Sequence, residues 1–100
     1  MENLSSKREG DTLTLYLKDR LDTKTSPIVQ KAVEPLLDGV VHLKVDMEEL
    51  NYISSAGLRV VLYMLQEMED RNGDMELYHV NEVIRDVFGL TGLMDVLTVI

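Results

Sequence analysis

The sequence contains no cysteine, no tryptophan, a single phenylalanine and no long run of hydrophobic residues. The absence of cysteine excludes disulfides, thiol catalysis and zinc–thiolate sites, and it fits a chain that folds in a reducing compartment. No apolar run approaches the roughly 18–20 residues of a membrane span, and residues 1–7 lack the charged and then apolar pattern of a signal peptide. We therefore expect a cytoplasmic protein with an aliphatic core and no membrane partner.

Basic residues are also scarce. The 100 residues include 18 Asp and Glu against 10 Lys and Arg, so the formal net charge is -8. An acidic surface repels nucleic-acid phosphates and anionic lipids, and the most basic stretch, Lys7 and Arg8, is followed directly by Glu9. A chain of this length buries one modest core. We expect a monomer with a single domain over residues 1–100 that does not bind nucleic acid directly.

Strict alternation of apolar and polar residues predicts three strands, at residues 12–17, 41–46 and 75–80. Residues 3–7 are expected to pair with the first of them across a turn at Gly10, because glycine readily adopts the positive φ that hairpin turns need. The sequence therefore predicts a hairpin followed by two further strands.

The helical spacing of apolar residues predicts three helices. The first starts at residues 25–27, where a hydroxyl residue is expected to provide the cap, bends at Pro35 and stops at residues 38–39. The second covers residues 58–70, and the third is a short helix over residues 81–89 that Asn81 caps and Gly89 closes.

The predicted order is β, β, α, β, α, β, α, which indicates an α/β domain with crossover units and a mixed sheet of four to five strands. The final residues, 96–100, are too few to assign. Helices are expected mainly on one face of the sheet, because polar residues occupy alternate strand positions. These residues are Thr14, Tyr16, His42, Lys44, Glu76 and Tyr78.

Most groups that could support chemistry have a simpler interpretation. The histidines, His42 and His79, fall in predicted strands without a neighbour at metal-ligand spacing, so we expect them to be structural. The acidic run at residues 46–49 lacks the alternating ligands and central glycine of a calcium loop, and a solvated turn at a strand end is favoured. No metal or cofactor is expected.

Residues 51–60 stand apart, because they join a strand end to a helix start and carry two adjacent serines. Backbone N–H groups point outward at a helix N-terminus, and the helix dipole favours negative charge there. A helix cap needs only one serine, and a glycine inside the first turn weakens the helix by around 1 kcal/mol relative to alanine. Gly57 therefore predicts the close approach of another group, and Ser54 and Ser55 are candidate functional hydroxyls.

The sequence argues against a nucleophilic enzyme. Residues 55–57 supply the second half of a Gly-x-Ser-x-Gly elbow, but Ile53 occupies the leading glycine position, and no histidine follows with an acidic partner in the usual order. A phosphate accepted on Ser55 is the better chemical use, because it adds about -1.5 to -2 charge at a helix N-terminus that tolerates anions.

Residues 52–62, Tyr-Ile-Ser-Ser-Ala-Gly-Leu-Arg-Val-Val-Leu, resemble the hallmark of STAS-domain anti-sigma factor antagonists. Supporting matches at residues 20–23, 45–46 and 91–93 extend the resemblance over essentially the whole chain. It implies a single STAS-like α/β domain that binds an anti-sigma factor with serine kinase activity and thereby frees the sigma factor. The kinase would phosphorylate a serine of this loop and abolish binding, and a serine phosphatase would reverse the modification.

By position, the resemblance makes Ser55 the phosphoacceptor. Many members carry Asp before the acceptor and Ser or Thr after it, where this chain has Ser54 and Ala56, so Ser54 is a rival acceptor. Asp46 matches an acidic residue that the family carries at a strand end. Two alternatives are open for it: it lies near the serine loop, or it only ends the strand. The residues expected to bind the partner are Asp22, Thr23, Asp46, Tyr52, Ser54, Ser55, Ala56, Gly57 and Arg59.

A second hypothesis also remains. In it the chain is a STAS scaffold or a nucleotide-binding module within a signalling assembly, and the serines only cap the helix. Such a protein would take up no phosphate.

Overall fold

The computed structural model describes residues 3–100, so residues 1–2 of the expected domain lie outside the described part. A four-stranded sheet has the strand order β1-β2-β3-β4. The strands are β1 (Leu4–Glu9), β2 (Thr12–Leu21), β3 (His42–Ile53) and β4 (Asp74–Tyr78). The helices are α1 (Thr25–Val33), α2 (Ser55–Asp70) and α3 (Glu82–Leu90), with short 3-10 turns η1 (Glu34–Leu37) and η2 (Leu93–Asp95). The predicted α/β class and element order are confirmed.

The pairing of the strands determines where the loops lie. β1 and β2 form an antiparallel hairpin across Gly10, whose φ of 62° is in the left-handed region as predicted. β2 pairs with β3 in parallel, and β3 pairs with β4 in parallel. The carboxyl ends of β2, β3 and β4 therefore lie at the same edge of the sheet, and the loops that lead into α1, α2 and α3 meet there.

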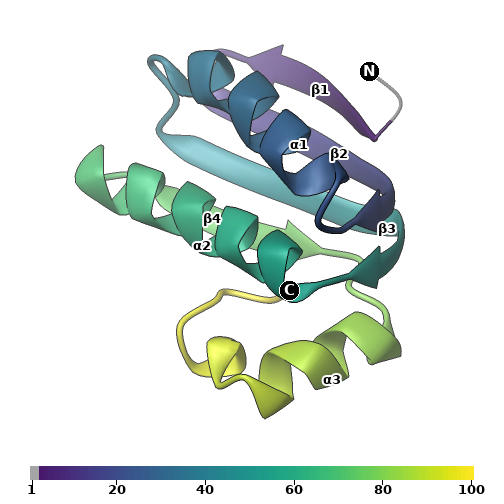
Figure 1. Ribbon diagram of the computed structural model, residues 1–100. Helices are drawn as coiled ribbons and strands as arrows, with labels where there is room; N and C mark the ends of the chain where they lie inside the picture. Colours follow the sequence, from purple (N-terminus) through teal and green to yellow (C-terminus); the bar gives the residue numbers. More distant parts are fainter. Residues whose placement is uncertain (1–2) are drawn as a thin grey trace.

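Helices α1 and α2 lie side by side on one face of the sheet, and α3 lies beyond β4 at the side of the domain (Figure 1). The alternate residues Leu13, Leu15 and Leu17 of β2 are buried against the helices. Their neighbours Thr14 and Tyr16 are only half-buried on the other face. The prediction of helices mainly on one face of a mixed sheet is confirmed.

Two strands are longer than predicted, and this places the acidic run differently. β2 continues to Leu21, and β3 begins at His42 and continues to Ile53. Residues 46–49 therefore lie within β3, and the prediction of a turn at a strand end is wrong. Register shifts between β2 and β3 lie beside this run. They let Met47 and Leu50 be buried while residues 48–49 stay exposed, so simple alternation ends although the strand continues.

The helix boundaries follow local chemistry closely. Pro35 ends the α-helical part of the first helix, and the chain continues as the 3-10 turn η1. α2 begins at Ser55, three residues before the predicted start at Leu58, and α3 ends at Leu90, one residue past the predicted closure. No helix of the described residues is long and apolar enough to span a membrane.

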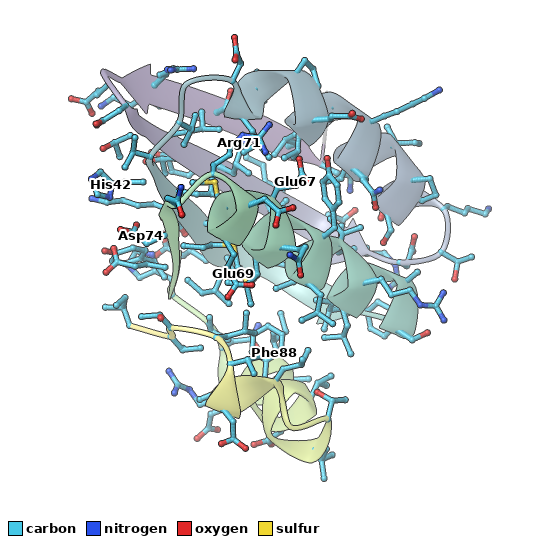
Figure 2. All side chains as sticks on the ribbon, turned by 90° about the vertical axis from the view of Figure 1, so that its left-hand side faces the viewer. His42, Glu67, Glu69, Arg71, Asp74 and Phe88 are labelled. Carbon is cyan, nitrogen blue, oxygen red and sulfur yellow. The ribbon has the colours of Figure 1, made fainter. Side chains whose placement is uncertain are left out.

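The C-terminal part of the chain closes the domain. Phe88 is fully buried and projects from α3 toward the sheet (Figure 2). The final segment, which the sequence left unassigned, forms an isolated parallel bridge between Val99 and Leu77 of β4. At the opposite end of β4, His42 Nδ1 lies 2.9 Å from Asp74 Oδ2 on the neighbouring strand, and Figure 2 shows the two side by side.

Candidate functional site

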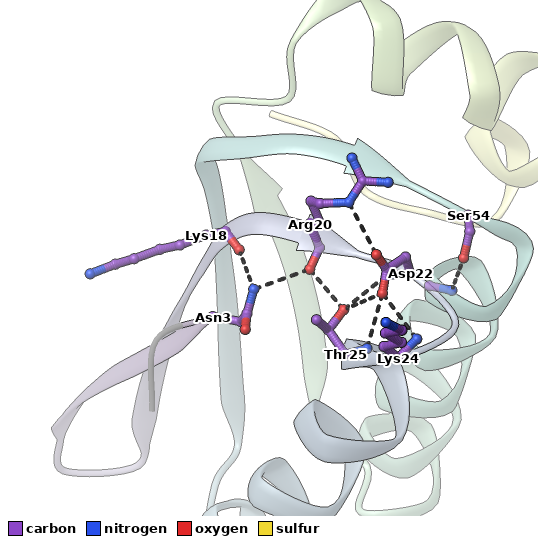
Figure 3. A network of polar contacts seen from close by, with 8 residues as sticks. Asn3, Lys18, Arg20, Asp22, Lys24, Thr25 and Ser54 are labelled. Carbon is purple, nitrogen blue, oxygen red and sulfur yellow. Dashed lines mark hydrogen bonds and ion pairs between the residues drawn. The ribbon is translucent and has the colours of Figure 1, made fainter.

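The candidate site lies where the loops after β2 and β3 meet. In the first loop, one carboxylate oxygen of Asp22 accepts hydrogen bonds from the backbone N–H groups of Lys24 and Thr25, both at 3.0 Å (Figure 3). The other oxygen accepts a bond from Arg20 Nε at 3.1 Å. Asp22 therefore caps α1, and the hydroxyl of Thr25 accepts the backbone N–H of Asp22 at 2.9 Å in return. The predicted hydroxyl at the helix start thus takes part in the cap but does not provide it alone, and it also donates to the carbonyl of Arg20 at 2.8 Å.

These bonds change the acidity of Asp22. The Thr25 N–H, followed by the Arg20 guanidinium, lowers the pKa of the Asp22 carboxyl from 3.8 to about 2. The carboxylate is therefore charged throughout the physiological pH range, and it holds the loop before α1 in one conformation.

The two loops are joined by backbone and side-chain contacts. The backbone N–H of Ser54 donates to the carbonyl of Leu21 at 3.0 Å. The guanidinium carbon of Arg20 lies 4.3 Å from the centre of the Tyr52 ring, a cation–π contact between β2 and β3. Tyr52 is 43% exposed, so the ring covers Arg20 and also presents an apolar surface.

The two serines have different environments. Ser54 is the N-cap of α2, is half-buried, and its Oγ accepts a hydrogen bond from the Gly57 N–H at 3.4 Å. Ser55 is the first helical residue, and its side chain is exposed. The resemblance ranks Ser55 as the acceptor and Ser54 as a rival, and in the structure Ser54 starts the helix while Ser55 is exposed to solvent.

Gly57 is required by close packing within the domain. A Cβ at this position would overlap the carbonyl oxygen of Leu21 and would lie 2.7 Å from Ile53 Cγ1. The predicted close approach is therefore confirmed, and the approaching group is the backbone at the end of β2. Gly57 acts by bringing α2 against the loop that carries Asp22, and it is itself buried.

A groove of about 410 Å³ lies between α1 and α2. Its lining includes Ala56 and Arg59 from α2, Ser26 and Lys31 from α1, and Glu34 from η1. The Oγ of Ser26 is buried without a hydrogen-bond partner among the described residues. Arg59 and Lys31 place two cations on this groove in a chain whose net charge is -8.

Asp46 is the predicted site residue that the structure does not bring to the loop. It lies in the middle of β3, and at about 3.3 Å per residue the remaining strand separates it from Ser54. Its Oδ1 instead accepts bonds from the Glu48 backbone N–H at 2.9 Å and from His79 Nδ1 at 3.1 Å. The predicted location of Asp46 at a strand end is wrong, because the bulged strand continues past it.

His79 also differs from its prediction. It follows β4 with a φ of 57°, outside the strand. One ring nitrogen of His79 and one carboxylate oxygen each of Asp46 and Glu48 lie within 4.8 Å of one another. The prediction that His79 has no neighbour at metal-ligand spacing is therefore wrong. The parallel pairing of β3 and β4 creates this group, and the hydrogen bond to Asp46 raises the pKa of His79.

The remaining expected residues lie on the elements that meet at this edge of the sheet: Asp22 and Thr23 after β2, Tyr52 in β3, and Ala56 and Arg59 in α2. Arg20, Thr25 and Ser26 also belong to the site, and the sequence did not point to them as site residues. The spacing of Asp22 and Thr25, which is that of a side-chain cap, is the signal that could have identified the loop.

The geometry defines a small α/β domain that presents the exposed Ser55 at the first position of a helix. The sequence model of the STAS domain family matches residues 3–100, and the chain therefore belongs to this family. A Listeria monocytogenes protein named anti-sigma-B factor antagonist is 27% identical over 94 residues, which is 92% of this chain and 82% of the relative.

Solved structures show the same fold. The anti-sigma factor antagonist SpoIIAA in its unphosphorylated form has a TM-score of 0.84 at 20% identity, covering 97% of this chain and 87% of that chain. The Bacillus cell fate determinant SpoIIAA in the phosphorylated form has a TM-score of 0.76 at 20% identity, covering 97% of this chain and 90% of that chain.

Proposed function

We propose that this protein is an anti-sigma factor antagonist controlled by phosphorylation. The unphosphorylated protein binds an anti-sigma factor that is also a serine kinase, and that factor then releases its sigma factor. Phosphorylation of Ser55 ends the binding. Membership of the STAS family and the names of the relatives support the antagonist role, and the existence of SpoIIAA in a phosphorylated form supports the switch.

The observation that carries the proposal is the exposed hydroxyl of Ser55 at the first position of α2. A kinase must reach the acceptor oxygen from solvent, and the side chain of Ser55 is the accessible one. Ser54 is half-buried, and its Oγ is held toward the Gly57 N–H, so phosphorylation there would disturb the helix cap. The structure therefore favours Ser55 over its rival on physical grounds.

The modification suits this position chemically. The Ser55 oxygen attacks the terminal phosphorus of ATP, the new O–P bond replaces the bond to ADP, and the hydroxyl proton passes to a base of the kinase. The added charge of about -1.5 to -2 lies at a helix N-terminus, where it is tolerated. The fold is retained while the surface presented to a partner changes sharply. A serine phosphatase reverses the step by hydrolysis, so the kinase and the phosphatase supply the catalytic residues.

The proposed partner surface consists of the exposed and half-buried residues around Ser55, with Asp22 positioning the first loop. Thr23 follows β2 and Tyr52 lies near the end of β3, both exposed, and Ala56 and Arg59 continue along α2. Gly57 contributes through packing, and Asp46 is outside this surface. The partner thus contacts two loops and the start of one helix, and the hydrogen bond between Ser54 and Leu21 joins the two loops.

Phosphorylation with the kinase encoded nearest to this gene tests the proposal. After incubation with ATP, mass spectrometry is expected to locate phosphate on Ser55 in the wild type and in Ser54→Ala, and no phosphate in Ser55→Ala. Ser55→Asp should bind the kinase more weakly than the wild type. Labelling of Ser55→Ala as strong as that of the wild type would exclude the assignment, and unchanged binding by Ser55→Asp would favour the scaffold hypothesis.

A further inference from the structure

Arg59 occupies the position on α2 that faces the first helical residue across one turn. Ser55 and Arg59 are four residues apart in the same helix, and both are exposed. Side chains at this spacing lie on the same face, with their Cβ atoms about 5–6 Å apart. The long arginine side chain can therefore reach a group that extends from Ser55.

Arg59 is also available for such a contact. None of the ion pairs among residues 3–100 involves it, whereas Arg20 and Arg71 each hold a carboxylate. The order of the charges is favourable, because an acidic group one turn N-terminal to a basic group complements the helix dipole. Guanidinium also matches phosphate oxygens with two parallel hydrogen bonds.

We infer that a phosphate on Ser55 pairs with Arg59 within the same helix, so that after phosphorylation the charge of Arg59 is no longer free to bind a partner. This inference rests on the proposed modification of Ser55. Before modification, Arg59 and Lys31 outnumber Glu34 among the charged groups of the groove between α1 and α2. After modification, Arg59 is neutralised by the phosphate, and Lys31 and Glu34 balance each other. The switch therefore removes a cation from the groove as well as adding an anion beside it.

The pairing can be measured without a partner protein. Phosphoserine is incorporated at position 55 during translation, and the phosphate is titrated by phosphorus NMR at low ionic strength. A nearby cation stabilises the dianion and lowers the second titration midpoint of the phosphate, which is about 6 when unperturbed. Arg59→Gln is expected to raise the midpoint by about 0.2–0.4 pH unit, the size of one helical ion pair.

Two variants of equal charge change serve as controls. Arg85→Gln removes an exposed arginine from α3, and Lys31→Gln removes the cation on the other side of the groove. Both are expected to leave the midpoint nearly unchanged. Phosphoserine at position 54 is the positional control, since Arg59 is five residues away from it, and its midpoint should not respond to Arg59→Gln.

An Arg59→Gln midpoint equal to that of Arg85→Gln would overturn the inference, as would a larger response to Lys31→Gln. These outcomes are separate from the fate of the proposed function. Ser55 could be labelled by the kinase without any effect of Arg59 on the titration, which would refute only the pairing. Conversely, a protein that no kinase labels would still report whether Arg59 pairs with the introduced phosphate.

Discussion

Replacement of Gly57 by alanine tests whether the packing of α2 against the first loop holds the serine turn in place. Gly57 lies in the first turn of the helix, and no positive φ is required there. Alanine should therefore stabilise the helix itself by about 1 kcal/mol. The added Cβ, however, meets the Leu21 carbonyl and Ile53 Cγ1, and the carbonyl already accepts the Ser54 N–H.

The steric effect is expected to be larger than the gain in helix propensity. Overpacking costs about 1–3 kcal/mol, and the upper part of that range applies because a backbone carbonyl moves less easily than the end of a side chain. Gly57→Ala should therefore lower the free energy of unfolding by about 1–2 kcal/mol. A domain of this size loses roughly 4–8 °C of melting temperature for each kcal/mol.

Gly89 provides a matched control, because it is also a helical glycine and a Cβ there would meet nothing within 4 Å. Gly89→Ala should raise the free energy of unfolding by about 0.5–1 kcal/mol through helix propensity and reduced chain entropy. Both variants are compared with the wild type by urea unfolding with a common slope. A Gly57→Ala protein as stable as Gly89→Ala would refute the packing argument.

Three further predictions concern the groups around the loops. Ser54→Ala should lower the free energy of unfolding, measured in urea, by about 0.5–1 kcal/mol, because it removes a helix cap. Ser55→Ala should change this free energy by less than about 0.5 kcal/mol. Equal losses in the two variants would contradict the assigned roles. The Asp22 carboxyl, followed by carbon-detected NMR, should titrate with a pKa of about 2. Its contribution to stability should be complete above its ordinary pKa of 3.8 and should be lost as the pH falls toward 2. A titration midpoint of 3.8 would contradict the cap. The pKa of His79 should lie above 6.5 and should fall in Asp46→Asn. The stability that the His79–Asp46 contact contributes should be present below pH 6.5 and lost as the pH rises through the raised pKa of His79. An unchanged His79 titration in Asp46→Asn would refute the contact.

Local sequence patterns predicted much of this fold because they report short-range preferences. The alternation of Leu13, Leu15 and Leu17 identified β2, and Gly10 and Pro35 marked a hairpin and a helix break that the structure contains. The ends of β2 and β3 were not predicted, because the bulges there interrupt the alternation without ending the strands.

The candidate site divides in the same way. The serine turn and Gly57 were visible in the sequence, because two hydroxyls and a glycine are unusual at a helix start. The function of Asp22 as a cap was not predicted, although Thr25 three residues later gives the spacing of a side-chain cap. The half-buried state of Ser54 was not visible, because its backbone N–H bonds to the carbonyl of Leu21, which the parallel pairing of β2 and β3 brings to it.

The sequence by itself determined the class of the domain, the order of its elements and the loop that carries the candidate hydroxyls, since these follow from periodicity and composition. Only the tertiary structure decided that Ser54 lies against the end of β2 while Ser55 is exposed, that the Leu21 backbone is the group that packs against Gly57, and that Asp46 binds His79 away from the loop. The physical reason is that parallel pairing brings together residues thirty or more positions apart in the chain, and no local preference encodes which of them will meet.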